Sequence, residues 1–180
     1  MGALDELLGR NRRIADGAGR ELPKLPRQRL VVLACMDHRV DPAAVLGLEL
    51  GDAVVIRNPG GRVTPAFLQQ LEVLARVFPQ VDADEEPFEL ALIQHTECGF
   101  ARLSGAEEHL GLVAGYFGVP PERLGERAPG DPYEGVRADT ELLAGEERVP
   151  GSLAVSGLVY EMGSRRLELV ERRAPLRTPS

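Results

Sequence analysis

The sequence has no tryptophan, and aromatic residues make up only 4% of its 180 residues. Its hydrophobic core must therefore be built mainly from leucine, valine, alanine and isoleucine. No uninterrupted apolar run approaches the roughly 20 residues that a membrane-spanning helix needs, so no membrane association is expected. Acidic residues outnumber basic ones and give a formal net charge of −7. This balance argues against nucleic-acid binding, for which a basic patch is the usual footprint.

Cysteine is also scarce, with only two in the chain. The first six residues carry acidic side chains where a signal peptide carries basic ones, and we expect a cytoplasmic protein. In that reducing compartment two cysteines indicate a metal site, a catalytic thiol or plain core packing more than a disulfide. A chain of 180 residues is long enough for one well-buried core, and we expect a single domain over 1–180.

Short apolar, β-branched runs are typical of strands buried on both faces of a parallel sheet. Three such runs occur, at 30–34, 53–56 and 88–93. Two later runs, 153–160 and 166–170, flank a turn and predict a terminal hairpin. The expected fold class is therefore α/β, with a parallel-centred β-sheet flanked by helices and a C-terminal hairpin or edge strands.

Several helix starts are marked by aspartate or threonine followed by proline, because the polar side chain caps the helix and proline fits its first turn. This pattern occurs at 41–42, 64–65 and 131–132. The second of these helices is expected to end near Phe78, before an acidic surface loop over 79–87.

Three other segments are less regular. Residues 1–22 are expected to form an amphipathic N-terminal arm helix, which needs another surface to pack on. Glycines interrupt 103–116, which predicts a broken helix, and 119–131 should be irregular because it is rich in proline, glycine and charge.

Both cysteines lie in polar clusters at the ends of apolar runs. Cys35 directly follows the first run, and Cys98 lies three residues after His95, which closely follows the third. Sites in parallel α/β sheets form beyond the carboxyl ends of the strands, so these three side chains can converge. Two thiolates and one imidazole suit tetrahedral zinc and leave an open fourth position, as in catalytic sites. Taken singly, each cysteine is more often a small buried hydrophobe, so the metal-site interpretation depends on the combination.

Asp37 and Arg39 lie two residues apart just after the first cysteine. If this segment is extended, their side chains share a face and can form a charge-assisted pair. One interpretation is a solvated ion pair of little energetic value. The other is that Arg39 holds Asp37 away from the metal, so that the carboxylate accepts a hydrogen bond from a zinc-bound water. The glycine-rich turn 57–61 is either a plain strand-to-helix connection or a backbone that approaches the site closely.

Three motifs, taken in order, resemble those of the β-class carbonic anhydrases, and most closely the small bacterial members. The resemblance is strong from about 30 to 100 and absent from about 119 to 149. The motifs are Cys35-Met36-Asp37-x-Arg39, Arg57-Asn58-x-Gly60-Gly61 and His95-Thr96-x-Cys98-Gly99.

This resemblance implies an enzyme that reversibly hydrates CO2 to bicarbonate and a proton by means of zinc-bound hydroxide. It implies one Zn²⁺ per chain, bound by Cys35, His95 and Cys98, with Asp37 and Arg39 as the catalytic dyad. It also implies a homodimer or higher homo-oligomer, in which the N-terminal helix wraps the neighbouring subunit.

Pro59, His38 and Gln94 depart from the usual pattern of the family, but they leave the implied ligands and dyad intact. Two alternatives therefore stay open. The same site supports hydrolysis of carbonyl sulfide or carbon disulfide in relatives of this family. The chain can also be a non-catalytic zinc-binding protein whose site is structural or closed.

Overall fold

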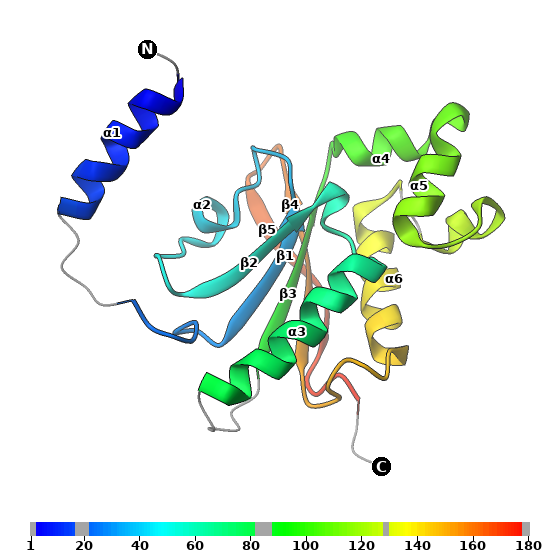
Figure 1. Cartoon of the computed structure of the whole chain (residues 1–180). Helices are drawn as coiled ribbons and strands as arrows, with labels where there is room; N and C mark the ends of the chain where they lie inside the picture. The colour runs from blue at the N-terminus through cyan, green and yellow to red at the C-terminus, as the bar shows by residue number, and fades with distance from the viewer. Residues whose placement is uncertain (1–2, 17–21, 82–87, 128–129, 178–180) are drawn as a thin grey trace.

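The computed structural model describes residues 3–16, 22–81, 88–127 and 130–177 (Figure 1). Five strands form one sheet in the order β2-β1-β3-β4-β5. The strands β1 to β4 run parallel, and β5 pairs antiparallel with β4, which confirms the parallel-centred sheet and the terminal hairpin. The strand bounds are β1 (Leu30–Cys35), β2 (Ala53–Asn58), β3 (Glu89–His95), β4 (Ala154–Glu161) and β5 (Arg166–Arg173).

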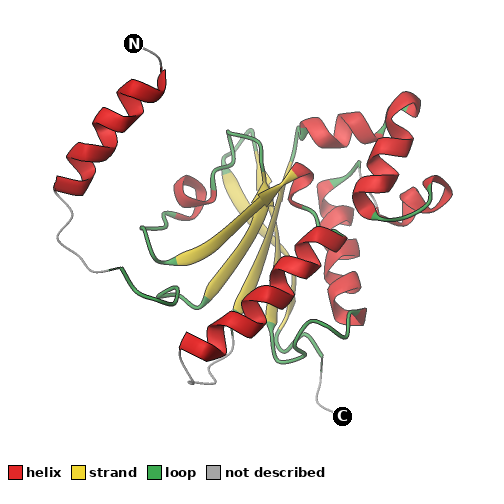
Figure 2. Cartoon of the chain, in the orientation of Figure 1, coloured by secondary structure: helices red, strands yellow, loops and turns green. Residues whose placement is uncertain are grey.

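Apart from the N-terminal helix, which stands away from the sheet, the helices connect the strands and lie around the sheet (Figure 2). The α-helices are α1 (Ala3–Asp16), α2 (Pro42–Leu46), α3 (Pro65–Val81), α4 (Gly99–Ser104), α5 (Leu110–Phe117) and α6 (Pro132–Gly145). Three 3-10 segments are η1 (Pro59–Gly61), η2 (Glu107–His109) and η3 (Pro121–Arg127). Within the described part of the chain, no helix is both long and apolar enough to cross a membrane.

The predicted helix starts are confirmed by their caps. The Asp41 side chain accepts a hydrogen bond from Ala43 N at 3.0 Å, and the Asp131 side chain accepts one from Tyr133 N at 2.8 Å. The break predicted within 103–116 is also present, because η2 separates α4 from α5.

Three boundaries differ from the predictions. The helix α3 does not end near Phe78 but continues through Pro79 to Val81. Pro79 has no N–H to donate to the preceding turn, but only two helical residues follow it, so a distortion at Pro79 displaces little of the helix. The rest of the predicted loop lies outside the described residues. The arm helix predicted over 1–22 is described over Ala3–Asp16, and Leu22 is not helical. Residues 1–2 and 17–21 lie outside the described residues. The stretch 119–131 is not wholly irregular, since it contains η3.

Each face of the sheet packs against a different set of elements. The helices α3 and α6 cover one face, where Leu33 and Leu92 of the strands belong to the same buried core cluster as Phe67 of α3 and Leu143 of α6. The other face carries Val32 and Ile93 and packs against α2 and the loops at the carboxyl edge. Neighbouring strands β1 and β3 are parallel, so their carboxyl ends lie side by side and bring the residues that follow them together.

Candidate metal centre

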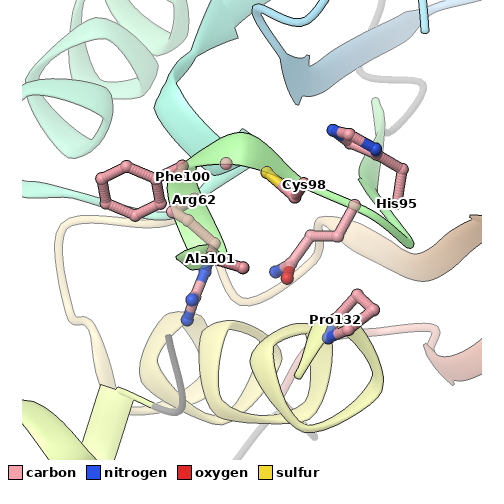
Figure 3. A pocket seen from close by; sticks show the side chains of 8 residues that line it. Arg62, His95, Cys98, Phe100, Ala101 and Pro132 are labelled. Carbon is pink, nitrogen blue, oxygen red and sulfur yellow. The ribbon is translucent and has the colours of Figure 1, made fainter. Parts of the chain in front are cut away.

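A pocket lies at the carboxyl end of β3, between η1, α4 and the first turn of α6 (Figure 3). Its wall combines the apolar ring of Phe100 with the polar side chains of Arg62 and Gln94. The full lining comprises Gly60, Arg62, Gln94, His95, Cys98, Phe100, Ala101 and Pro132. The pocket therefore gives access to two of the predicted ligand residues.

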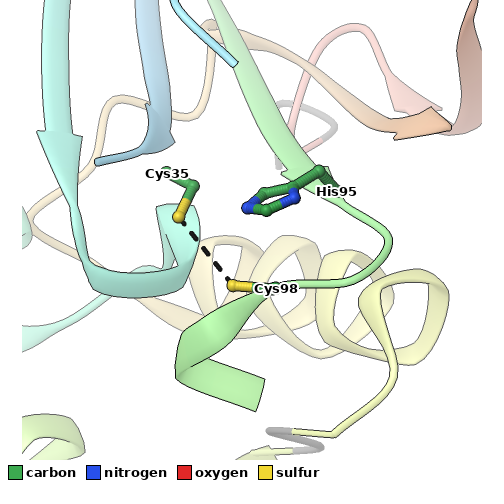
Figure 4. A group of neighbouring side chains, drawn as sticks. All are labelled: Cys35, His95 and Cys98. Carbon is green, nitrogen blue, oxygen red and sulfur yellow. Dashed lines mark hydrogen bonds between the residues drawn. The ribbon is translucent and has the colours of Figure 1, made fainter. Parts of the chain in front are cut away.

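The structure brings Cys35, His95 and Cys98 together at this edge of the sheet (Figure 4). They lie at the end of β1, at the end of β3 and at the N-cap position of α4, and all three are buried. Their possible ligand atoms lie within 4.8 Å of one another, and the two sulfur atoms are 3.8 Å apart. Tetrahedral zinc with bonds of about 2.3 Å to sulfur places two sulfur atoms at about that separation. The spacing of the thiols therefore fits zinc.

The orientation of His95 also fits a metal. Its Nδ1 lies 2.8 Å from the main-chain oxygen of Thr96. A carbonyl oxygen can only accept, so Nδ1 carries the proton and Nε2 presents a lone pair. Nε2 is buried and has no hydrogen-bond partner among the described residues. Leaving such an atom unpaired is costly, and a metal ion would satisfy it.

The pKa values of the two thiols are shifted in opposite directions. The hydrogen bond with Cys35 and the adjacent His95 lower the pKa of Cys98 to about 4. The same pairing, together with burial, raises the pKa of Cys35 above its usual range. Burial opposes a positive charge on His95, but the neighbouring Cys98 thiolate outweighs it and the pKa of His95 is raised. The two sulfur atoms are 3.8 Å apart, so a thiolate on Cys35 as well as on Cys98 needs a cation to offset their repulsion, and a divalent metal supplies it.

Asp37 and Arg39 form a bidentate pair beside this cluster. Arg39 Nε donates to Asp37 Oδ1 at 3.0 Å and Nη2 donates to Oδ2 at 2.7 Å. The main-chain N–H of Arg39 donates to Oδ1 as well, at 3.0 Å. These bonds hold the pKa of Asp37 well below its usual range, so the carboxylate stays ionised and can act as a hydrogen-bond acceptor.

Sequence reasoning assigned no role to Glu97, yet this residue joins the dyad to the ligand loop. Arg39 Nη2 donates to Glu97 O at 3.3 Å, and Arg39 Nη1 lies 3.8 Å from the Glu97 carboxylate. Glu97 adopts a left-handed conformation, with φ of 58°, between His95 and Cys98. Nothing in the residue types signals this contact, because it depends on the path of the turn.

The glycine-rich turn approaches the site closely, as one of the two interpretations predicts. Gly61 has φ of 63°, and a Cβ atom on it would lie 2.6 Å from Ile93 O and 2.7 Å from Cys35 N. Only glycine leaves room there for the ends of β1 and β3. Asn58 closes the turn, since its side chain both accepts from Arg62 N and donates to Arg62 O at 2.8 Å.

A buried ionic network behind the pocket was also missed. The Asp139 carboxylate is fully buried and accepts hydrogen bonds from Arg62 Nε at 2.7 Å, Arg127 Nη2 at 3.0 Å and Gln94 Nε2 at 3.2 Å. One signal was available, because Asp139 falls at helical spacing with Val136 and therefore on the core face of α6. Its partners come from distant segments and could not be read from the sequence.

Comparison with known proteins agrees with these features. The sequence model for the carbonic anhydrase family matches residues 30–115, which include the cluster and the dyad. Beta-carbonic anhydrase 1 of Mycobacterium tuberculosis is 28% identical over 170 residues, covering 94% of this chain and 99% of that protein. A carbon disulfide hydrolase of Acidianus sp. is 29% identical, covering 87% of this chain and 84% of that protein.

Solved structures agree as well. The carbonic anhydrase of Streptococcus mutans superposes with a TM-score of 0.68 at 27% identity, covering 95% of this chain and 99% of that one. An apo form of carbon disulfide hydrolase superposes with a TM-score of 0.60 at 26% identity, covering 96% and 91%. The matched segment, the full-length relatives and the shared fold together make this chain similar to the β-carbonic anhydrase family in both sequence and structure.

Proposed function

We propose that this protein is a zinc-dependent carbonic anhydrase, which interconverts CO2 and water with bicarbonate and a proton. The observation that carries the proposal is the convergence of two thiols and an unpartnered imidazole nitrogen beside an ionised carboxylate. A purely structural zinc site has no need for a carboxylate held by arginine. The pairing of Asp37 with Arg39 therefore favours a catalytic site over a closed one.

Cys35, His95 and Cys98 would bind one zinc ion per chain. When bound, zinc supplies a Lewis acid that lowers the pKa of a water molecule enough for it to act as a nucleophile near neutral pH. Two thiolates donate negative charge to the metal and weaken this effect relative to three neutral imidazoles. A nearby hydrogen-bond acceptor that orients the nucleophile is therefore of particular value in this donor set.

Asp37 is that acceptor. Its carboxylate would accept a hydrogen bond from the attacking water and direct the oxygen lone pair toward the carbon of CO2. Arg39 occupies both carboxylate oxygens and keeps Asp37 ionised in its role as acceptor. The oxygen of the water forms the new bond to carbon, one C–O double bond opens, and the released proton passes to solvent.

Carbon disulfide hydrolysis is the second candidate, because relatives named for that activity match this chain about as well as the carbonic anhydrases do. The cluster and the dyad would serve either substrate. A comparison of the initial rates with CO2 and CS2 on one zinc-loaded sample separates the two candidates.

The decisive experiment combines stopped-flow CO2 hydration with metal analysis of the same sample. We expect one zinc per chain and a hydration rate that rises with pH. Asp37→Asn should keep its zinc and lose activity by at least about a hundredfold. A fully zinc-loaded wild-type protein that does not hydrate CO2 would overturn the proposal, and CS2 turnover by that sample would favour the second candidate.

We further propose a homodimer or higher homo-oligomer in a reducing compartment such as the cytoplasm. No described residue of α1 is buried, and its apolar side chains Leu4 and Ile14 are 68% and 69% exposed. Val55 and Leu169 are also exposed on the sheet face that α2 leaves partly uncovered. A second copy packing on these surfaces would bury them.

Two free thiols suited to zinc favour a compartment in which they stay reduced.

A further inference from the structure

The position of the dyad depends on the short segment that carries it. This segment leaves the sheet at Cys35 and ends at Asp41, the N-cap of α2. Arg39 fixes the carboxylate of Asp37, but both residues belong to the same segment and would move with it. What holds the main chain of residues 35–41 to the sheet therefore decides where Asp37 lies.

Arg57 makes that connection. It is the penultimate residue of β2 and pairs in register with Ala34 of β1. Its guanidinium donates from Nε to Cys35 O at 3.1 Å, from Nη2 to Asp37 O at 2.6 Å and from Nη1 to Asp41 Oδ2 at 2.8 Å. One planar group thus holds the start, the middle and the end of the segment.

The chemistry of these acceptors selects arginine. The guanidinium carries donors in a rigid fork, whereas the ammonium group of lysine is a point charge that cannot span the same three acceptors. Asp41 supplies the neutralising charge and also caps α2 through Ala43 N, so Arg57 fixes the segment at a rigid element. Asp37 O accepts a second bond from Val40 N at 3.1 Å, which closes the turn around the dyad.

We infer that Arg57 is a positioning residue for the dyad: it holds the main chain of residues 35–41 so that the carboxylate of Asp37 stays oriented for the attacking water. The inference rests on the proposed function. Arg57 acts through the backbone, because its hydrogen bonds go to two carbonyl oxygens and to the side chain of Asp41.

Arg27 provides a matched control. It donates from Nε to Asp52 Oδ1 at 3.0 Å and from Nη2 to Leu50 O at 2.6 Å, so it also ties a carboxylate and a carbonyl to one guanidinium. Its side chain is 32% exposed, close to the 26% of Arg57. The contacts of Arg27, however, lie just before β2 begins, at the opposite end of that strand from Arg57.

The first test is a double-mutant cycle on zinc-loaded protein. Arg57→Gln should lower kcat for CO2 hydration at least about tenfold with KM changed less than about twofold, and Arg57→Lys should lose less. Arg27→Gln should change kcat less than about twofold. In an Asp37→Asn background, Arg57→Gln should cost less than about twofold, because the group it positions is gone. Equal losses in both backgrounds would overturn the inference.

The second test needs no activity. Hydrogen exchange of the zinc-loaded protein should show residues 36–40 exchanging about tenfold faster in Arg57→Gln and unchanged in Arg27→Gln. The amides that report are Met36 N, bonded to Asn58 O at 2.9 Å, and Val40 N. Unchanged exchange at these amides would overturn the inference even if the enzyme is active. If the wild-type protein hydrates no CO2, the proposed function fails, but hydrogen exchange still shows whether Arg57 fixes the main chain of residues 36–40. If Arg57→Gln does not fold, both measurements are made on Arg57→Lys instead.

Discussion

Arg62 and Asp139 form an ion pair in the interior, with 2.7 Å between Nε and Oδ2 and side-chain exposures of 3% and 0%. Arg127 approaches the other carboxylate oxygen at 3.0 Å. Both guanidinium groups lie over the ring of Phe117, at 4.9 and 5.2 Å from its centroid. Two buried cations thus share the Asp139 carboxylate, and the pair connects the residue that follows η1 to α6 behind the pocket.

Asp139→Asn should be strongly destabilising. The substitution preserves the shape of the side chain but removes the negative charge that pairs with two buried guanidinium groups. Breaking a buried ion pair by removing one partner costs about 3–5 kcal/mol, and we expect a loss of that size in the free energy of unfolding. Urea unfolding of the zinc-loaded protein measures it.

The exposed pair of Arg123 and Glu126 is the control for this experiment. Its side chains are 61% and 58% exposed, so Glu126→Gln should leave the unfolding curve unchanged within error. If Asp139→Asn proved as neutral as Glu126→Gln, the carboxylate would not be the element that holds the two buried arginines in place.

Gly61→Ala should damage both stability and metal binding. A Cβ atom there would meet Ile93 O and Cys35 N at 2.6 and 2.7 Å, and alanine disfavours the left-handed φ of 63°. Strain and overpacking together should lower the free energy of unfolding by at least about 2 kcal/mol. Displacement of Cys35 should also lower the zinc content below one per chain.

Gly115→Ala is the matched control for that substitution. Gly115 lies inside α5, is exposed, and a Cβ atom on it would meet nothing within 4 Å. Alanine should stabilise this helix by about 0.5–1 kcal/mol and leave the zinc content unchanged. Normal zinc content in Gly61→Ala would contradict the close approach of the turn to the cluster.

The elements that could be predicted from the sequence are those fixed by local chemistry. The cap of Asp41 on α2 and that of Asp131 on α6 depend on residues two or three positions away, and both are present. The buried strands were readable because a parallel sheet covered on both faces needs continuous apolar runs. The convergence expected of Cys35 and His95 followed from these strands, since the carboxyl ends of neighbouring parallel strands lie side by side.

The features that could not be predicted depend on long-range contacts or on chain path. Arg62 and Asp139 are 77 residues apart and meet only after α6 packs on the sheet. The role of Arg57 depends on where three acceptors of another segment fall after folding. Pro79 shows the opposite case: proline commonly ends a helix, but here only two helical residues follow it, so a distortion at Pro79 displaces little of α3.

The free energy of unfolding should fall as the pH is lowered, and Glu89→Gln should make this fall smaller. Glu89 Oε1 accepts hydrogen bonds from Ser156 Oγ at 2.7 Å and from Arg172 Nη2 at 2.9 Å, and these contacts lower the pKa of Glu89 in the folded protein. A group whose pKa is lower when folded stabilises above its unfolded pKa of about 4.3 and loses that contribution as pH falls through the folded value.

The measurement is the difference in unfolding free energy between wild type and Glu89→Gln. It should be constant between pH 6 and 7, narrow as pH falls below about 5, and keep only the pH-independent part in stronger acid. If the difference in unfolding free energy between the two proteins grew as the pH fell, the direction of the Glu89 pKa shift would be contradicted.

Removing zinc should destabilise the protein, because the three predicted ligands come together only in the folded chain. An ion that binds the folded state alone stabilises it by about 2.7 kcal/mol when its free concentration is a hundred times its Kd. Treatment with a strong chelator should therefore lower the unfolding midpoint, and added zinc should restore it.

Cys98→Ser should contain less than one zinc per chain, and chelator should not shift its unfolding midpoint. Asp37→Asn should keep both its zinc and the full shift, since the dyad lies beside the cluster rather than within it; loss of zinc from this variant would instead make Asp37 a metal ligand.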